Sequence, residues 1–286
     1  MPTKIEKDTL SGTDTTGHNW DGVKELNTPL PSWWVYTFYA TIVFSIVYAV
    51  LYPSVPWLTG HTTGLLGYTA RTELTQELAA QAKARSVFVD KIQKTPLADI
   101  RKDPELLAFA MAGGRSAFQN NCMQCHGSGG AGSVGYPALV DDDWIWGGSL
   151  AQIFQTIEHG IRNNDPDSRT SMMPKFGVDN LLTPAQIDGL TQYVLSLSGK
   201  GKATPEAAAL FKEQCASCHQ PDGKGNQEVG APNLTDGIWL YGGDKDSIYK
   251  SIFYARNGNM PAWTGRLDEA TLKMLAIYVH ALGGGR

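Results

Sequence analysis

Hydrophobic and polar positions are unevenly distributed along the chain, and one long segment carries no charge. No Asp, Glu, Lys or Arg stands between Leu26 and Ala70. Within this segment, an apolar run from Trp33 to Tyr52 has only threonine and serine as its strongly polar residues. A helix of about 20 residues crosses a hydrocarbon core of roughly 30 Å. The run therefore predicts one transmembrane helix, in an anchor at residues 31–57.

Two other structures can contain such a run, and the sequence favours neither. One alternative is a core helix of a soluble protein. Where such a helix reaches the surface it shows a polar face, and this run has none; a fully buried core helix would also have none. A cleaved signal peptide would begin nearer the N-terminus and would have a basic flank and a small-residue cleavage site. Trp33 and Trp34 at one end, and Tyr52 and Trp57 at the other, suit the two membrane–water interfaces.

The periodicity changes after the apolar run. Between residues 69 and 93, Leu74, Leu78, Ala82 and Val89 recur near helical spacing with charged residues between them. We expect a helix there, within a linker at residues 58–104. Residues 1–30 are polar and are predicted to lie outside the membrane.

The remainder of the chain contains a duplicated pattern. Two segments, 105–199 and 202–286, show the same order: a short helix, a Cys/His motif, a loop, a helix, Met-Pro and a terminal helix. A repeat of this length indicates a duplicated domain rather than a solenoid. The matching positions are Phe118 and Phe211, Pro137 and Pro232, Trp144 and Trp239, Ile153 and Ile248, Ile157 and Ile252, Met173 and Met260, and Tyr193 and Tyr278.

Each repeat contains the pattern Cys-x-x-Cys-His, at residues 122–126 and 215–219. This spacing is the attachment signature of c-type haem, in which two thiols hold the porphyrin and the histidine lies beneath the iron. We therefore predict two covalently bound haem c groups. The attachment residues are Cys122, Cys125, Cys215 and Cys218, and the proximal iron ligands are His126 and His219.

Three simpler interpretations use the same cysteines. A zinc site would leave the two histidines and the duplicated downstream sequence unexplained. Thioredoxin-like redox pairs would be surrounded by a βαβ pattern, which is absent. Two disulfides are compatible with an oxidising compartment.

An electron-transfer haem needs a sixth iron ligand, and a thioether in place of a second histidine raises its reduction potential. Met173 and Met260 precede proline at matching places. We expect each methionine to serve the haem of its own repeat, although methionine is also a common core filler. In the first repeat, Met172 and His159 are rival ligands.

Other matched residues have two interpretations each. Pro137 and Pro232 offer carbonyl oxygens to the ligand histidines, or form simple turns. Arg162 and Arg256 pair with haem propionates, or are solvated surface residues. Four aromatic residues either line the haem edges or belong to ordinary core packing: Trp144, Trp146, Trp239 and Tyr241.

Composition adds one exclusion. The formal net charge is −4, which gives no reason to expect nucleic-acid binding.

The two repeats resemble tandem class I cytochrome c domains. The segment from Gly17 to Trp34 resembles the opening of the dihaem subunit III of cbb3-type cytochrome c oxidases, the FixP-like family. The resemblance covers residues 17–286. It implies a mainly α fold, in which one N-terminal transmembrane helix precedes two cytochrome c domains.

The resemblance also implies a function. The chain would pass electrons from a donor cytochrome c to a monohaem subunit, and on to the catalytic haem–copper subunit that reduces oxygen. It would be an electron-transfer subunit of a proton-pumping oxidase and not an enzyme as an isolated chain. It would lie in the bacterial inner membrane, with residues 1–30 in the cytoplasm and the haem domains in the periplasm.

Two other classes of protein remain as alternatives. One is a free-standing dihaem electron carrier, which conflicts with the anchor. The other is a dihaem peroxidase or gas sensor, which needs a vacant or labile sixth position at one iron. The two Met-Pro segments argue against such a position.

Overall fold

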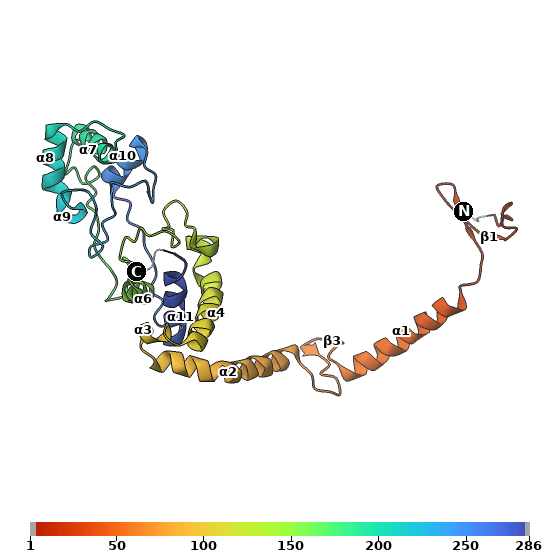
Figure 1. The fold of residues 1–286 in the computed structure, drawn as a ribbon. Helices are drawn as coiled ribbons and strands as arrows, with labels where there is room; N and C mark the ends of the chain where they lie inside the picture. The colour runs from red at the N-terminus through yellow and green to blue at the C-terminus, as the bar shows by residue number, and fades with distance from the viewer. Residues whose placement is uncertain (1–3, 284–286) are drawn as a thin grey trace. The chain divides into compact units, whose positions relative to one another are not determined.

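The described part of the chain is mainly helical. A computed structural model describes residues 4–283, and the chain divides into two units between Lys83 and Ala84 (Figure 1). The boundaries expected from sequence at residues 31–57, 58–104, 105–199 and 202–286 stay predictions.

The first unit begins with a hairpin that the sequence analysis did not anticipate. Strand β1 (Thr15–Trp20) pairs antiparallel with β2 (Val23–Leu26), and Trp20 lies opposite Val23. The turn residues Asp21 and Gly22 both have positive φ, 51° and 99°. A two-residue hairpin turn of type I′ needs this conformation, and Asp-Gly favours it.

Helix α1 (Ser32–Leu51) confirms the helix predicted from the apolar run. It has 20 residues and a mean hydropathy of 1.8, and no residue of its span is buried. At ~1.5 Å per residue it is about 30 Å long. The hydroxyls of Thr37, Thr41 and Ser45 each donate to a carbonyl oxygen of the same helix. These three hydroxyls are therefore satisfied without water, as an apolar environment requires.

A second small hairpin and a long helix follow. Strands β3 (Pro56–Trp57) and β4 (Gly60–His61) pair antiparallel. Helix α2 (Ala70–Lys94) then covers almost the range expected from the periodicity at residues 69–93. The end of α2 belongs to the second unit, where Phe88 stacks on Phe109 with ring centroids 4.9 Å apart.

The rest of the second unit is built from short helices. Proline or a polar cap begins several of them; Thr183, for example, forms a capping box directly before Pro184, the first residue of its helix. The helices are α3 (Leu97–Ile100), α4 (Pro104–Asn121), α5 (Met123–His126), the 3₁₀ helix η1 (Ser128–Gly130), α6 (Leu150–His159), α7 (Pro184–Leu197), α8 (Pro205–Gln214), α9 (Ala216–His219), α10 (Lys245–Tyr254) and α11 (Glu269–His280).

The helices do not pack in the order of the two repeats. Helix α11, which closes the second repeat, packs on α4 and α6 of the first repeat. Helix α7, which closes the first repeat, packs on α8 and α10 of the second. We call α4, α5, α6 and α11 the first lobe, and α7, α8, α9 and α10 the second lobe (Figure 1). Each lobe therefore contains the terminal helix of the other repeat.

Each lobe has its own apolar core. In the first lobe, Phe118, Ile153 and Leu275 belong to one buried cluster. In the second lobe, Phe211 and Ile187 are buried in another. The aromatic pair of each core also joins the two repeats, because Phe118 lies 5.5 Å from Tyr278 and Phe211 lies 4.8 Å from Tyr193, between ring centroids.

Two glycines of α4 permit its close crossing with α11. A Cβ atom at Gly114 would lie 2.2 Å from the carbonyl oxygen of Met274 and 2.6 Å from Cβ of Tyr278. A Cβ atom at Gly113 would lie 2.4 Å from Sδ of Met274. No larger side chain fits at this crossing without displacing α11.

Candidate haem-binding sites

The two Cys-x-x-Cys-His motifs have the same local structure. Cys122 ends α4 and begins α5, and Cys215 does the same between α8 and α9, with φ of −110° and −118°. The amide of His126 donates to the carbonyl oxygen of Cys122, and that of His219 to Cys215, both at 2.9 Å. One helical turn therefore presents two thiols and an imidazole in each lobe.

The thiols do not match the simpler interpretations. All four cysteines are free, and the two motifs lie in different lobes, so the structure does not assemble the four thiolates of a zinc site. Burial raises the pKa of Cys122 and of Cys215 to about 11. A redox-active pair needs a lowered thiol pKa instead. The first thiol of each motif is thus protonated at neutral pH, unlike the nucleophile of a redox pair.

The two histidines are oriented by proline carbonyls. Nδ1 of His126 lies 3.0 Å from the carbonyl oxygen of Pro137, and Nδ1 of His219 lies 3.0 Å from that of Pro232. A carbonyl oxygen only accepts, so Nδ1–H donates and Nε2 keeps its lone pair. These contacts confirm the acceptor role predicted for both prolines.

Burial also keeps these imidazoles neutral. It lowers the pKa of both His126 and His219, while the hydrogen bond to proline opposes this shift. A histidine binds a metal ion through its neutral form. Each motif therefore combines two thiols with a neutral imidazole in a fixed orientation, which fits a c-type haem.

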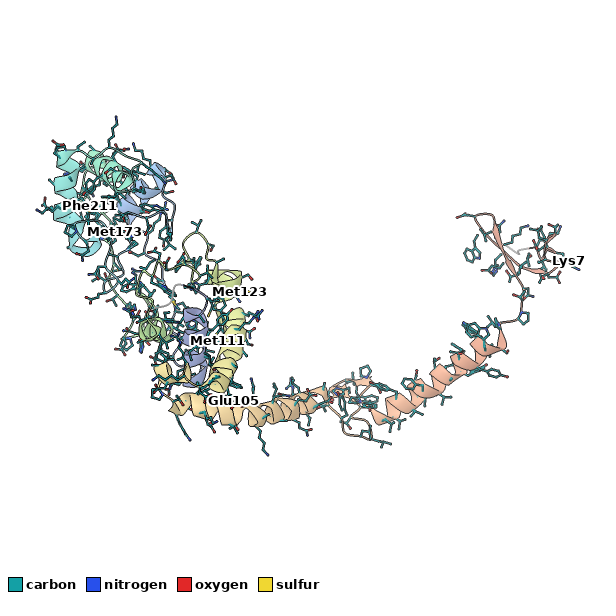
Figure 2. All side chains as sticks on the ribbon, in the orientation of Figure 1. Lys7, Glu105, Met111, Met123, Met173 and Phe211 are labelled. Atoms are coloured by element: carbon teal, nitrogen blue, oxygen red, sulfur yellow. The ribbon has the colours of Figure 1, made fainter. Side chains whose placement is uncertain are left out.

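The two methionines pack crosswise with respect to the repeats. Met260 packs on the first-lobe core, together with Cys122. Met173 packs on the second-lobe core, together with Cys215, and Figure 2 shows it near Phe211 of that lobe. The expectation joined each methionine to the motif of its own repeat. In the structure, each methionine instead packs on the core that the first cysteine of the other motif also contacts.

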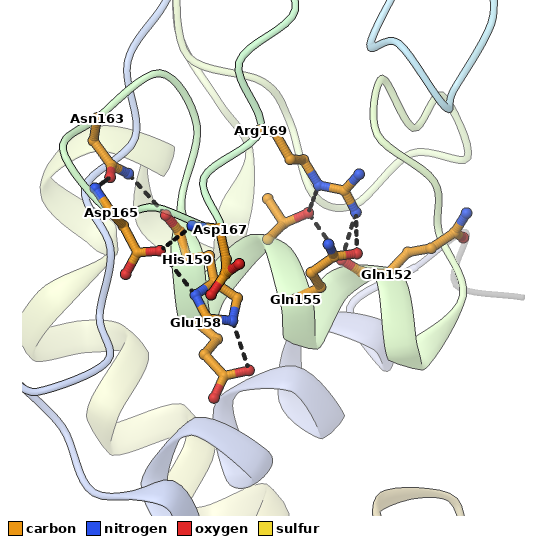
Figure 3. Close-up of polar contacts among 9 residues, drawn as sticks. Gln152, Gln155, Glu158, His159, Asn163, Asp165, Asp167 and Arg169 are labelled. Carbon is orange, nitrogen blue, oxygen red and sulfur yellow. Dashed lines mark hydrogen bonds and ion pairs between the residues drawn. The ribbon is translucent and has the colours of Figure 1, made fainter.

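Met172 and His159, the rival ligands of the first repeat, have different surroundings from Met173. The side chain of Met172 is 65% exposed. Nδ1 of His159 lies 3.0 Å from Asp165 Oδ1, and its Nε2 lies 3.4 Å from Glu158 Oε2 (Figure 3). Both imidazole nitrogens of His159 therefore face carboxylates, which argues against iron ligation by this residue.

Both candidate propionate-binding arginines have protein partners. Arg162 donates to the carbonyl oxygens of Ser171 and Gly258, and its guanidinium lies 5.7 Å from the ring centroid of Trp146. Arg256 donates to the carbonyl oxygen of Tyr241 and lies 5.5 Å from that ring. Neither arginine is a freely solvated surface residue, and both bind the backbone and an aromatic face.

The matched aromatic residues divide into two roles. Trp144 and Trp239 pack on the cores that contain Cys122 and Cys215. Trp146 lies against Gly230, where a Cβ atom would be 2.2 Å from its ring, and Tyr241 lies 3.3 Å from such an atom at Gly135. Trp146 and Tyr241 thus contact the loop that follows the other Cys/His motif.

Several polar residues near the two methionines were not predicted from the sequence. In the segment that precedes Met172, Arg169 donates to Thr156 Oγ1 at 3.0 Å and to Gln155 Oε1 at 3.2 Å (Figure 3). Its guanidinium also lies 5.1 Å from the ring centroid of Trp146. Asn163 and Asn257 were not singled out either, although each follows one of the noted arginines.

Family models match three parts of the chain. A family model described as the N-terminal domain of cytochrome oxidase-cbb3, FixP, matches residues 12–59. A cytochrome c model matches residues 111–198, and a model for subunit III of cbb3-type cytochrome c oxidase matches residues 202–279.

Whole-length relatives carry the same description. The chain is 52% identical over 290 residues to the cbb3-type cytochrome c oxidase subunit FixP of Bradyrhizobium sp. (strain ORS 278), with 100% of both chains covered. It is 47% identical over 289 residues to subunit CcoP of Cereibacter sphaeroides, again over 100% of both chains. It is 50% identical over 291 residues to subunit CcoP of Azospirillum brasilense, covering 98% of this chain and 99% of the relative. These matches confirm the resemblance and the fold class predicted from sequence.

Proposed function

Because this chain belongs to the FixP/CcoP family of cbb3-type cytochrome c oxidase subunits, we propose that it is the membrane-anchored dihaem electron carrier of such an oxidase. It takes electrons from a donor cytochrome c and passes them to the monohaem subunit. From there they reach the catalytic haem–copper subunit, where oxygen is reduced. The chain itself carries electrons and is not the site of oxygen reduction.

One observation carries this proposal: the same set of groups meets twice. In each lobe a His donates to a proline carbonyl, and a Met packs on the same core as the first cysteine of the motif. When bound, a haem iron with a His and a Met ligand exchanges one electron at a raised potential. The protein's part is to attach the haem through two thiols and to fix the two axial ligands.

The ligand sets combine the two repeats. The first haem would be held by Cys122 and Cys125, and His126 and Met260 would ligate its iron. The second would be held by Cys215 and Cys218, and His219 and Met173 would ligate its iron. Neither repeat completes a site alone, so both must fold together before either haem has its sixth ligand.

Helix α1 supports a single-pass anchor in the bacterial inner membrane. In the resembled family, haem is attached outside the cytoplasm, which puts residues 58–286 in the periplasm and residues 1–30 in the cytoplasm. Protease added to spheroplasts should cut the haem-bearing part while leaving a protected N-terminal fragment. Protection of the haem-bearing part in intact spheroplasts would contradict this orientation.

Co-purification tests the proposed partners. The chain, extracted in a mild detergent, should carry the monohaem and haem–copper subunits with it. Its haems should become reduced when a reduced donor cytochrome c is added. Isolation of the chain alone under conditions that preserve the oxidase would instead support a free-standing dihaem carrier.

A peroxidase or gas sensor is the alternative from another class. It needs an iron with an open sixth position, whereas Met173 and Met260 each pack against a core that the first cysteine of one motif also contacts. Carbon monoxide should therefore bind neither ferrous haem stoichiometrically. Stoichiometric binding to one of them, with no loss of a methionine ligand, would favour the alternative.

A further inference from the structure

We propose that Asn163 and Asn257 are positioning residues, each of which fixes the backbone of the methionine ligand contributed by the other repeat. Asn163 holds Met260, and Asn257 holds Met173. This inference rests on the proposed function, because it takes both methionines as the sixth ligands.

The first contact bridges two segments that are far apart in sequence. Nδ2 of Asn163 donates to the carbonyl oxygen of Met260 at 2.8 Å and to that of His159 at 2.9 Å. Its Oδ1 accepts from the amide of Asp165 at 2.7 Å. Because both ends of the amide are engaged, the side chain has one fixed orientation and ties Met260 to the end of α6.

Neighbouring backbone groups reinforce this contact. The amide of Ile161 donates to the carbonyl oxygen of Met260, and the amide of Met260 donates to that of Ile161, both at 2.9 Å. A Cβ atom at Gly160 would lie 2.4 Å from the same Met260 oxygen. The backbone of Met260 is thus held on both its amide and its carbonyl side.

The second contact is the counterpart in the other lobe. Nδ2 of Asn257 donates to the carbonyl oxygen of Met173 at 3.3 Å, and the amide of Met173 donates to Oδ1 of Asn257 at 3.3 Å. One side-chain amide therefore binds both backbone polar groups of the ligand residue.

Each asparagine occurs in the same dipeptide. Arg162-Asn163 and Arg256-Asn257 follow α6 and α10, where the chain leaves one lobe. In both pairs the arginine lies over an aromatic ring, Trp146 or Tyr241. The repeated division of roles indicates that the arginine fixes the dipeptide and the asparagine reaches the methionine of the other repeat.

The physical need for such a contact follows from the ligand. Methionine has three rotatable side-chain bonds and a neutral sulfur, so its position depends on how well its backbone is held. A ligand whose supporting contacts are lost binds its metal more weakly. Removal of either asparagine should therefore loosen one iron–sulfur bond and leave the other intact.

The test uses the full-length protein in its purified oxidase complex, with Asn163→Leu and Asn257→Leu as near-isosteric variants that cannot hydrogen-bond. Each variant should keep both covalent haems. Each should lose the ferric methionine–iron charge-transfer absorbance of one haem, and each reduced variant complex should bind about one equivalent of carbon monoxide more than the unmodified complex, whose oxygen-reducing haem also binds it. The double variant should lose both signals. Asn164→Leu, at the exposed neighbouring position, should lose neither.

The outcomes separate this inference from the proposed function. Absence of both methionine signals in the unmodified protein would contradict the ligand assignment itself. Their presence there, with full retention in both single variants, would overturn the role of the asparagines alone. If a leucine variant does not accumulate, Asn163→Asp and Asn257→Asp remove the same donor within a polar side chain of equal size, and the same two readouts apply.

Discussion

The ammonium group of Lys273 on α11 donates to the carbonyl oxygen of Gln93 at the end of α2, at 2.7 Å. It also lies within hydrogen-bond distance of the carbonyl oxygens of Ile92 and Thr95 and forms an ion pair with Glu269. Lys273 is only 9% exposed and Ile92 is fully buried, so this lysine satisfies a backbone group that water does not reach. Lys273 thus connects the C-terminal end of α2 to α11.

Lys273→Met should therefore destabilise the first lobe by about 1–3 kcal/mol, because buried carbonyl oxygens lose their donor. Thermal unfolding and amide hydrogen exchange at residues 92–97 measure the effect. Lys250→Met, which removes an exposed pair with Asp246, is the matched control and should change stability little. Equal effects of the two variants would contradict the role of Lys273.

Gly114→Ala should disrupt the crossing of α4 and α11. Its new methyl group would meet Met274 and Tyr278 well inside van der Waals contact, and such overpacking costs about 1–3 kcal/mol. Gly189→Ala is the control, because a Cβ atom in this α7 position lies 3.8 Å from its nearest neighbour. That helical glycine should tolerate alanine or gain up to ~1 kcal/mol of stability. Thermal denaturation of both variants decides the point.

Haem attachment is testable on a denaturing gel. The unmodified protein should keep two haems after denaturation, and the double change Cys215→Ala with Cys218→Ala should remove one of them. The physical reason is that, without these two cysteines, the second lobe has no thiol that could form a thioether bond to the haem. Haem staining with iron quantification gives the count, and retention of two haems in the variant would contradict the assignment.

The exchanged methionines predict which haem responds to which substitution. In the variant without Cys215 and Cys218, only the first haem remains, and Met260→His should lower its potential within the ~0.8 V range that axial ligands set. Met173→His in the same background should leave it nearly unchanged. A redox titration that follows haem absorbance measures both. The reverse pattern would restore the pairing expected from sequence order.

A cluster of carboxylates predicts a pH dependence of stability. Burial, and then the nearby Asp236, Asp141 and Asp142, raise the pKa of Asp143 to about 6. The unfolded chain has an ordinary carboxyl pKa of ~4, so the native state binds more protons between these values. Stability from this group is present below pH ~4 and is lost as pH rises through 6.

Asp143→Asn should accordingly raise Tm at pH 7.5 and have little effect at pH 4. Asp179→Asn, at an exposed position, serves as the control and should shift Tm little at either pH. Calorimetry across this range measures the difference. A benefit of Asp143→Asn that is equal at both pH values would argue against titration as its cause.

Local sequence determined much of this protein. The uncharged apolar run of α1, the capping box at Thr183 and the two Cys-x-x-Cys-His turns are written in short stretches, because helix formation and haem attachment depend on neighbouring residues. The acceptor role of Pro137 and Pro232 could also be predicted, since a ligand histidine needs one fixed partner. The hairpin of β1 and β2 was missed, although Asp21-Gly22 is a turn signal for it.

Only the tertiary structure decided which lobe each terminal helix and each methionine packs against. The two terminal helices have similar apolar patterns, ending in Tyr193-Val194 and Tyr278-Val279, so periodicity alone fits either helix to either lobe. The choice depends on contacts between segments far apart in sequence, such as the backbone of Met274 lying against Gly114 and the amide of Asn163 bound to Met260. Such contacts depend on the shape and hydrogen-bonding groups of surfaces that exist only after the chain has folded. For this reason the sequence could identify Met173 and Met260 as candidate ligands, whereas the core against which each one packs could be read only from the folded chain.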